Sequence, residues 1–196
     1  MRVAVWSASL GTASSNRAGL DVASGWLRQA GAEVIGVGGL ELIPPFRADQ
    51  ADTPPAVVAA LRSQIEAADA VLIAPPEYAG GLAGAAKNAL DWLVGSGSLY
   101  HRLAGVLSIG TTGGVFAREQ LIRTLSWQGA ITVASLGIEA PRSKMADGVF
   151  TDPVSIAAIE AWAADVVIAN RLSHTDRIAK AQPLLDPLGI DVARFG

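Results

Sequence analysis

Short apolar runs alternate along the chain with stretches in which apolar residues recur at helical spacing. Five of these runs predict buried strands, over residues 2–7, 33–37, 70–74, 103–109 and 131–136. The helical spacing predicts helices over residues 18–30, 55–69, 85–94, 117–128 and 153–172. Strands that alternate with helices favour an α/β fold, in which helices cover both faces of a parallel sheet.

Five strands in this arrangement fit the doubly wound, flavodoxin-like three-layer sandwich with strand order 2-1-3-4-5. We find no internal repeat and no linker, so the 196 residues are predicted to form a single domain. From about Ser173 the apolar pattern becomes loose. Pro183 and Pro187 fall in this stretch and predict an irregular C-terminal tail.

Composition narrows the possible functions. The net charge is −3 and basic residues are scattered, so nucleic acid is not an expected partner. The chain has no cysteine, which excludes disulfides, thiolate metal sites and cysteine nucleophiles. His101 and His174 are the only histidines, too few for a histidine-based metal centre, so no metal is predicted. We find no secretory signal and no uncharged 18-residue span, and we therefore expect a cytoplasmic protein without a membrane segment.

Ligands of open α/β sheets bind at the carboxyl ends of the strands, where the strand order reverses. Three loops are expected there, over residues 7–16, 75–84 and 110–114. The first contains five hydroxyl-bearing residues and precedes a helix N-terminus, which suits a phosphate monoester. An ordinary serine-rich turn with a helix cap explains the same residues. The loop lacks the glycine spacing of a Walker or dinucleotide-binding motif.

The second loop, residues 75–81, reads Pro-Pro-Glu-Tyr-Ala-Gly-Gly. Its glycines allow the backbone to approach a flat ring, and Tyr78 is placed to flank that ring. A plain turn packed by one tyrosine fits these residues as well.

From this loop onward the chain resembles the family of NADPH-dependent FMN reductases, which includes chromate, quinone and azo reductases. Residues 76–81, Pro-Glu-Tyr-Ala-Gly-Gly, and residues 84–93, Gly-Ala-Ala-Lys-Asn-Ala-Leu-Asp-Trp-Leu, resemble the family signature PEYNGS…PGxLKNALDWL. The resemblance extends over roughly residues 2–172. Two positions differ: Gly11 replaces the usual arginine of the first loop, and Ala79 replaces the asparagine of the signature.

The resemblance implies a site for FMN. It places the FMN phosphate among Ser9, Gly11, Ser14, Ser15 and Asn16. It places the flavin ring between the second loop, with Pro76, Glu77, Tyr78, Ala79 and Gly80, and the third loop, with Ser108, Thr111, Gly113 and Gly114. Tyr78 and Thr111 are expected to face the substrate.

The implied function is an NAD(P)H-dependent flavin oxidoreductase that uses FMN and passes electrons from NADPH or NADH to a small acceptor: a quinone, an azo compound, chromate or free flavin. No catalytic side chain is expected, because the flavin itself accepts the hydride. Two alternatives stay open, a flavin-binding protein without turnover and an FMN reductase that supplies reduced flavin to a monooxygenase. A homodimer or homotetramer is expected, with subunit contacts near Lys87, Asn88, Asp91 and Trp92.

Overall fold

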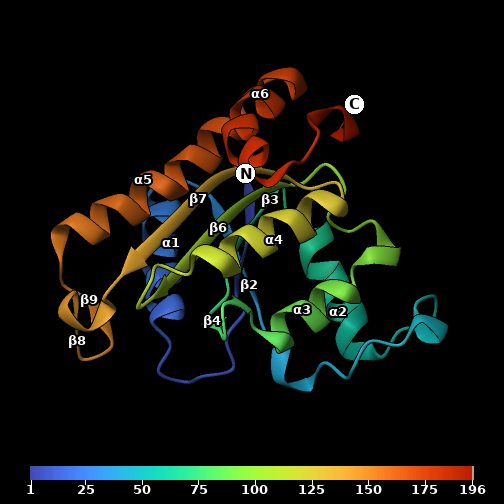
Figure 1. The fold of residues 1–196 in the computed structure, drawn as a ribbon, viewed down its shortest axis with the longest axis horizontal. Coiled ribbons are helices and arrows are strands. Elements are labelled where there is room, and N and C mark those ends of the chain that lie inside the picture. Colours follow the sequence, from blue (N-terminus) through green and yellow to red (C-terminus); the bar gives the residue numbers. More distant parts are fainter. Residues whose placement is uncertain (196) are drawn as a thin grey trace.

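A five-stranded parallel sheet forms the centre of the computed structural model, which describes residues 1–195 (Figure 1). Its strands stand in the order β2-β1-β3-β6-β7. Their bounds are β1 (Arg2–Ser7), β2 (Glu33–Val37), β3 (Ala70–Ala74), β6 (Leu103–Gly110) and β7 (Ile131–Glu139). The predicted fold class and the predicted order 2-1-3-4-5 are therefore confirmed.

Helices cover both faces of this sheet (Figure 1). One face carries α1 (Ser15–Gln29) and α5 (Pro153–Asn170), which also pack against each other. The other face carries α2 (Ala56–Glu66), α3 (Gly84–Asp91) and α4 (Val115–Trp127). This is the three-layer sandwich that parallel strands with helical crossovers require.

The central strand β3 is buried along its whole length, as expected of a strand covered on both faces. Close packing of α5 depends on a neighbouring glycine in β6. A Cβ added at Gly105 would stand 2.7 Å from Leu72 Cδ2 and 3.1 Å from Trp162 Cζ2. Gly105 thus lets the indole of Trp162 lie directly on the sheet.

The C-terminal segment is helical, so the prediction of an irregular tail from about residue 173 is wrong. Helix α6 (His174–Leu185) is capped by Ser173, whose hydroxyl accepts a hydrogen bond from the Asp176 amide at 3.2 Å. It packs against the edge strand β7 and buries Ala181 and Leu185. Pro183 lies inside the helix and lacks the amide that would donate to the carbonyl four residues earlier. Burial against β7 outweighs this lost hydrogen bond and the weak local pattern.

Two short hairpins were not expected from the sequence. One pairs β4 (Glu77–Tyr78) with β5 (Gly81–Leu82), and the other pairs β8 (Met145–Ala146) with β9 (Val149–Phe150). Both turns have positive φ at their two central residues, 51° and 70° at Ala79-Gly80 and 50° and 81° at Asp147-Gly148. Strands of two residues carry too little periodicity to be recognised in a sequence.

Helix α5 is the one helix in the described part of the chain that is long and apolar enough to span a membrane by length and composition. It carries Glu160 and Asp165 and packs against β6, β7 and α1, with Trp162 and Val166 on the buried face. These contacts are those of a helix that covers a sheet.

Candidate functional site

A cleft of about 410 Å³ opens at the carboxyl ends of β1, β3 and β6, where the three loops meet. It is lined by Ser9, Gly11, Ala13, Ser14, Ser15, Asn16, Pro76, Glu77, Tyr78, Ile109, Gly110, Thr111, Thr112 and Gly114. Its volume is in the range of small-molecule and cofactor sites.

The N-terminus of α1 forms one end of the cleft. The hydroxyl of Ser14 caps the helix by accepting a hydrogen bond from the Arg17 amide at 3.4 Å, and the first turn holds no acidic side chain. The Ser9 hydroxyl accepts a hydrogen bond from the Gly11 amide at 3.3 Å. The helix dipole and the remaining amides of the first turn favour an anion at this end.

Asn16 joins the first loop to the third. Its side chain is 3% exposed, and its amide oxygen accepts a hydrogen bond from the Ile109 amide at 2.8 Å. Its amide nitrogen donates to the Ile109 carbonyl at 3.4 Å. Both ends of the side chain are thus engaged with β6, so Asn16 holds the start of α1 against the sheet, although the sequence predicts a phosphate contact for it.

Glu77 joins the second loop to the third. One carboxylate oxygen accepts a hydrogen bond from the Thr112 hydroxyl at 3.1 Å, and the other accepts from the Ala117 amide at 3.0 Å. The hairpin that follows is held to the same helix, because the Leu82 amide donates to the side-chain oxygen of Gln120 at 2.7 Å. Two walls of the cleft are therefore fixed relative to each other.

Ser108 lies behind the cleft and connects β6 to the start of the second loop. It is 1% exposed, and its hydroxyl donates to the Pro75 carbonyl at 2.9 Å. Gly114 stands directly against it with a φ of +61°, and an added Cβ would collide with the Ser108 hydroxyl. A glycine is required at position 114 both for this contact and for the left-handed backbone.

Arg118 supports the third loop from α4 and was not predicted. Its Nε donates to the Gly113 carbonyl at 3.1 Å and its Nη1 donates to the Ser135 hydroxyl at 3.0 Å. Burial lowers the pKa of Arg118, partly opposed by the carboxylates of Glu119 and Glu77. The only sequence signal is an arginine one turn after a glycine pair, and this is too common a pattern to identify a site.

The cleft brings together most of the predicted site residues. Those that line it are Ser9, Gly11, Ser14, Ser15, Asn16, Pro76, Glu77, Tyr78, Thr111 and Gly114. Four others do not line it: Ala79, Gly80, Ser108 and Gly113. Ala79 and Gly80 form the hairpin turn, whereas Ser108 and Gly113 hold the loops from behind. Lining residues that the sequence reasoning missed are Ala13, Ile109, Gly110 and Thr112.

The helix after the second loop holds a neighbouring segment of its own chain. Asn88 donates to the Pro44 carbonyl at 2.9 Å and accepts from the Phe46 amide at 2.7 Å. The indole of Trp92 is fully buried and also donates to the Pro44 carbonyl, at 2.9 Å. Of the four residues predicted to lie at a subunit contact, Asn88 and Trp92 thus have internal roles, while Lys87 and Asp91 form an ion pair of 2.6 Å.

The residues present fit FMN. The phosphate end has hydroxyls and a helix N-terminus without a competing carboxylate, and the other end is walled by backbone at Pro76 and Gly110. A Cβ at Gly110 would meet nothing within 4 Å, so space remains beside this wall. Within residues 1–195, no group of three or more potential metal ligands is found.

Comparisons with known proteins agree with this geometry. A family model described as NADPH-dependent FMN reductase matches residues 1–141. An NADPH azoreductase of Bacillus sp. (strain OY1-2) is 29% identical over 89 residues, which are 44% of this chain and 49% of that protein. A quinone reductase of Escherichia coli (strain K12) is 44% identical over 66 residues, which are 33% of this chain and 35% of that protein. The chain therefore spans half or less of the length of these relatives.

A solved structure resembles almost the whole fold. The flavoenzyme FerB of Paracoccus denitrificans, an NAD(P)H:(acceptor) oxidoreductase, has a TM-score of 0.70 and 26% sequence identity. The match covers 85% of this chain and 97% of FerB. Since the family model covers more than half of the chain, including all three loops of the cleft, the chain belongs to the NADPH-dependent FMN reductase family.

Proposed function

We propose that the protein is an NAD(P)H-dependent flavin oxidoreductase that passes electrons through FMN to a small acceptor, such as a quinone, an azo compound, chromate or free flavin. The observation that carries this proposal is the cleft itself. It joins an anion-binding helix N-terminus to two backbone walls at the point where the strand order reverses. FMN supplies the redox chemistry there, since its ring accepts a hydride and passes the electrons on.

The residues of the chain orient the flavin and leave one side of it open. Ser9, Ser14 and Ser15 are placed for the phosphate, and the walls at 76–78 and 110–112 are placed for the ring. Tyr78 is 65% exposed at the rim and Thr111 is also exposed, so we assign both to the acceptor side. The proposal includes no catalytic side chain.

Gly11 favours a second candidate function. It is exposed and lines the phosphate end, where the family usually carries an arginine. Without that charge-assisted contact FMN is held less tightly. A reductase that releases reduced flavin to a monooxygenase partner fits this feature, as an alternative to one with resident FMN.

A homo-oligomer and a cytoplasmic location are also part of the proposal. Three large apolar side chains beside the cleft are more than half exposed: Leu10, Tyr78 and Phe116. Exposed apolar groups of this size near a site suit a subunit contact. The cytoplasmic location is proposed because the NAD(P)H that the reaction requires is available in the cytoplasm. We also propose that the chain forms one domain, since its elements share one core.

The first experiment is an absorbance spectrum of the purified protein after addition of FMN and gel filtration. Retained flavin bands that bleach with NADPH or NADH under argon, and return when menadione is added, support the proposal. Retained bands that do not bleach identify a flavin-binding protein without turnover. If no flavin is retained and no acceptor is reduced even with excess FMN, the proposed function is wrong.

The substitution Gly11→Arg tests whether the protein retains FMN as a cofactor or releases it as reduced flavin. The Cβ at this position meets only the Ser9 hydroxyl, at an ordinary 3.7 Å, so the substitution fits. We expect the affinity for FMN to rise about tenfold, because a charged hydrogen bond to phosphate contributes roughly 1.5–3 kcal/mol. Gly25→Arg in the middle of α1 is the matched control, since its Cβ meets nothing within 4 Å.

A further inference from the structure

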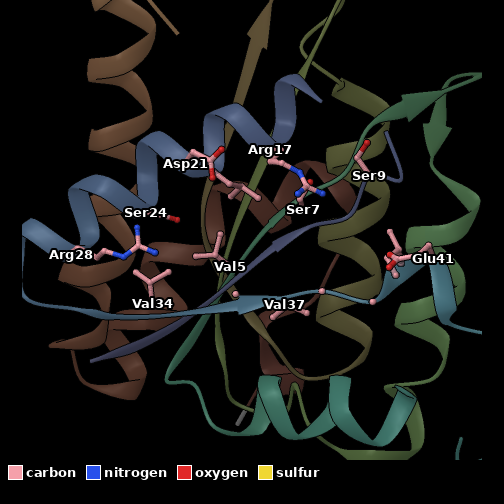
Figure 2. Close-up of a pocket in the computed structure, with 15 residues that line it drawn as sticks. Val5, Ser7, Ser9, Arg17, Asp21, Ser24, Arg28, Val34, Val37 and Glu41 are labelled. Atoms are coloured by element: carbon pink, nitrogen blue, oxygen red, sulfur yellow. The ribbon is translucent and has the colours of Figure 1, made fainter. Parts of the chain in front are cut away.

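A second cavity lies beside the flavin cleft, between α1 and the edge strand β2 (Figure 2). It has a volume of about 430 Å³ and shares the side chain of Ser9 with the flavin cleft. We call this cavity the α1–β2 groove. Nothing in the proposed function uses it.

A missing side chain keeps the groove open. Gly36 is paired in register with Val5 on the neighbouring strand and stands two residues after Val34, so all three positions face α1. Figure 2 shows Val5 and Val34 beside the groove, where they form an apolar floor. Gly36 also lines the groove and adds no side chain to this floor. A Cβ at Gly36 would meet nothing within 4 Å.

Two serine hydroxyls beside the groove have no hydrogen-bond partner among the described residues. Ser24 is only 6% exposed, and none of the residues described in the structure forms a hydrogen bond with its hydroxyl. The hydroxyl of Ser7 is also buried and has no partner within the same residues. Buried polar groups in proteins are normally satisfied, so the buried Ser7 hydroxyl indicates a polar ligand or bound water at this end of the groove.

Charged side chains line the groove along one face of α1. Figure 2 shows Arg17, Asp21, Ser24 and Arg28 along this face, with Glu41 opposite, after β2. Neither arginine lies within 4 Å of a carboxylate in the part of the chain that is described. Arg17 and Arg28 stand eleven positions apart in α1, about 16 Å along the helix axis, so the groove is elongated.

We propose that the α1–β2 groove binds a nucleoside 5′-phosphate moiety. The guanidinium of Arg17, at the end nearest the flavin cleft, is placed for the phosphate. The carboxylate of Glu41 follows the second strand, where dinucleotide-binding folds use an acidic residue to accept hydrogen bonds from ribose. The valine floor suits the flat face of a base, and Ser24 and Arg28 suit its polar edge or a second phosphate.

A nucleoside 5′-phosphate moiety is part of two larger ligands that suit this protein. Both follow from the proposed function. One is the adenosine half of NAD(P)H, whose nicotinamide must reach the flavin. The other is the adenosine half of FAD, whose flavin end would occupy the cleft. Ser9 borders both cavities at the phosphate end of the cleft, so a ligand that occupies both would pass this residue.

The test uses calorimetry with 5′-AMP and 2′,5′-ADP on the protein with added FMN. We expect saturable binding that Gly36→Leu weakens by at least about tenfold, because the new side chain fills the groove. Arg28→Gln is expected to weaken binding by about fivefold or more, because it removes a charged donor. Gln29→Glu is the matched control, since it changes the charge equally on the next residue, which does not line the groove. Thermal unfolding verifies that each variant folds.

Competition distinguishes the two sources. If 2′,5′-ADP competes with NADPH and Gly36→Leu raises the KM for NADPH with kcat unchanged, the donor is the source. If FAD binds more tightly than FMN, and Gly36→Leu removes that advantage but leaves the KM for NADPH unchanged, FAD is the source. Absence of nucleotide binding, or binding that Gly36→Leu and Arg28→Gln leave unchanged, overturns the inference. Flavin retention and bleaching test the proposed function separately, so either idea can fail alone.

Discussion

The amide of Ala117, in the first turn of α4, donates a hydrogen bond of 3.0 Å to the carboxylate of Glu77. The contact places a negative charge at a helix N-terminus and ties the hairpin loop to the third loop of the cleft. A carboxylate in this position acts by orienting the walls that hold the flavin.

Replacing this carboxylate is expected to loosen the flavin site. Glu77→Ala removes both hydrogen bonds and should weaken FMN binding by about tenfold, since hydrogen bonds to charged groups contribute roughly 1.5–3 kcal/mol. Glu77→Gln keeps one acceptor and should fall between Ala and the native residue. Quenching of flavin fluorescence measures the dissociation constant. Glu119→Gln is the control, at an exposed position on α4, the helix that contains Ala117. An equal loss of FMN affinity in that variant would contradict the role given to Glu77.

The turn of the first hairpin is strained at Ala79. Its φ of 51° is unfavourable for alanine, whereas asparagine followed by glycine is the preferred pair in two-residue hairpin turns. Ala79→Asn is therefore expected to stabilise the protein by about 0.5–1 kcal/mol. Urea unfolding measures the change. Asp147→Asn, in the second hairpin, should have little effect, because that turn already carries a favoured residue.

Much of the fold could be predicted because its signals are local. Each of the five strands is a short apolar run, and five strands that alternate with helices fit the doubly wound order that the structure has. The helix α6 could not be predicted in this way. Its residues Ala181 and Leu185 are buried only because β7 offers an edge to cover, and Pro183 argued against a helix. The tertiary contact with β7 stabilises this helix, although the local preference of its residues for a helix is weak.

In the site, too, some features could be predicted from the local sequence and others depend on tertiary contacts. Residues before a helix N-terminus, such as Ser9 and Ser14, reach the cleft because the strand-to-helix connection positions them. Ser108 and Gly113 belong to the same motif as Thr111, but β6 and the left-handed turn direct them behind the cleft. A sequence motif does not distinguish a side chain that contacts a ligand from one that holds a loop.

Gly114→Ala tests how tightly the third loop is packed. The new methyl group would collide with the Ser108 hydroxyl and would force alanine into a left-handed backbone, for a combined loss of about 2–4 kcal/mol. Gly110→Ala should cost far less, because its Cβ meets nothing within 4 Å. Thermal unfolding of both variants gives the comparison. Equal losses would show that the contact with Ser108 does not constrain the loop.

The cap of α5 gives a pH-dependent prediction. The Asp152 carboxylate accepts hydrogen bonds from the Ser155 hydroxyl at 2.6 Å and the Ser155 amide at 2.9 Å, and these lower the pKa of Asp152 below its usual 3.8. A lowered pKa in the folded state means that the carboxylate stabilises the fold above the unfolded pKa. This stabilisation is lost as the pH falls through the folded pKa.

Asp152→Ala should therefore lower the melting temperature at pH 7, and its difference from the native protein should shrink as the pH falls below about 4. Ser155→Ala keeps the carboxylate but removes the hydrogen bond that contributes most to its lowered pKa. The pH-dependent loss of stability should therefore be smaller than in the native protein and should end at a higher pH. Melting curves measured from pH 7 to pH 2 follow both effects. Asp147→Asn removes an exposed carboxylate that caps no helix and serves as the control. A difference between Asp152→Ala and the native protein that stays constant over this range would show that the charge of Asp152 does not stabilise the cap.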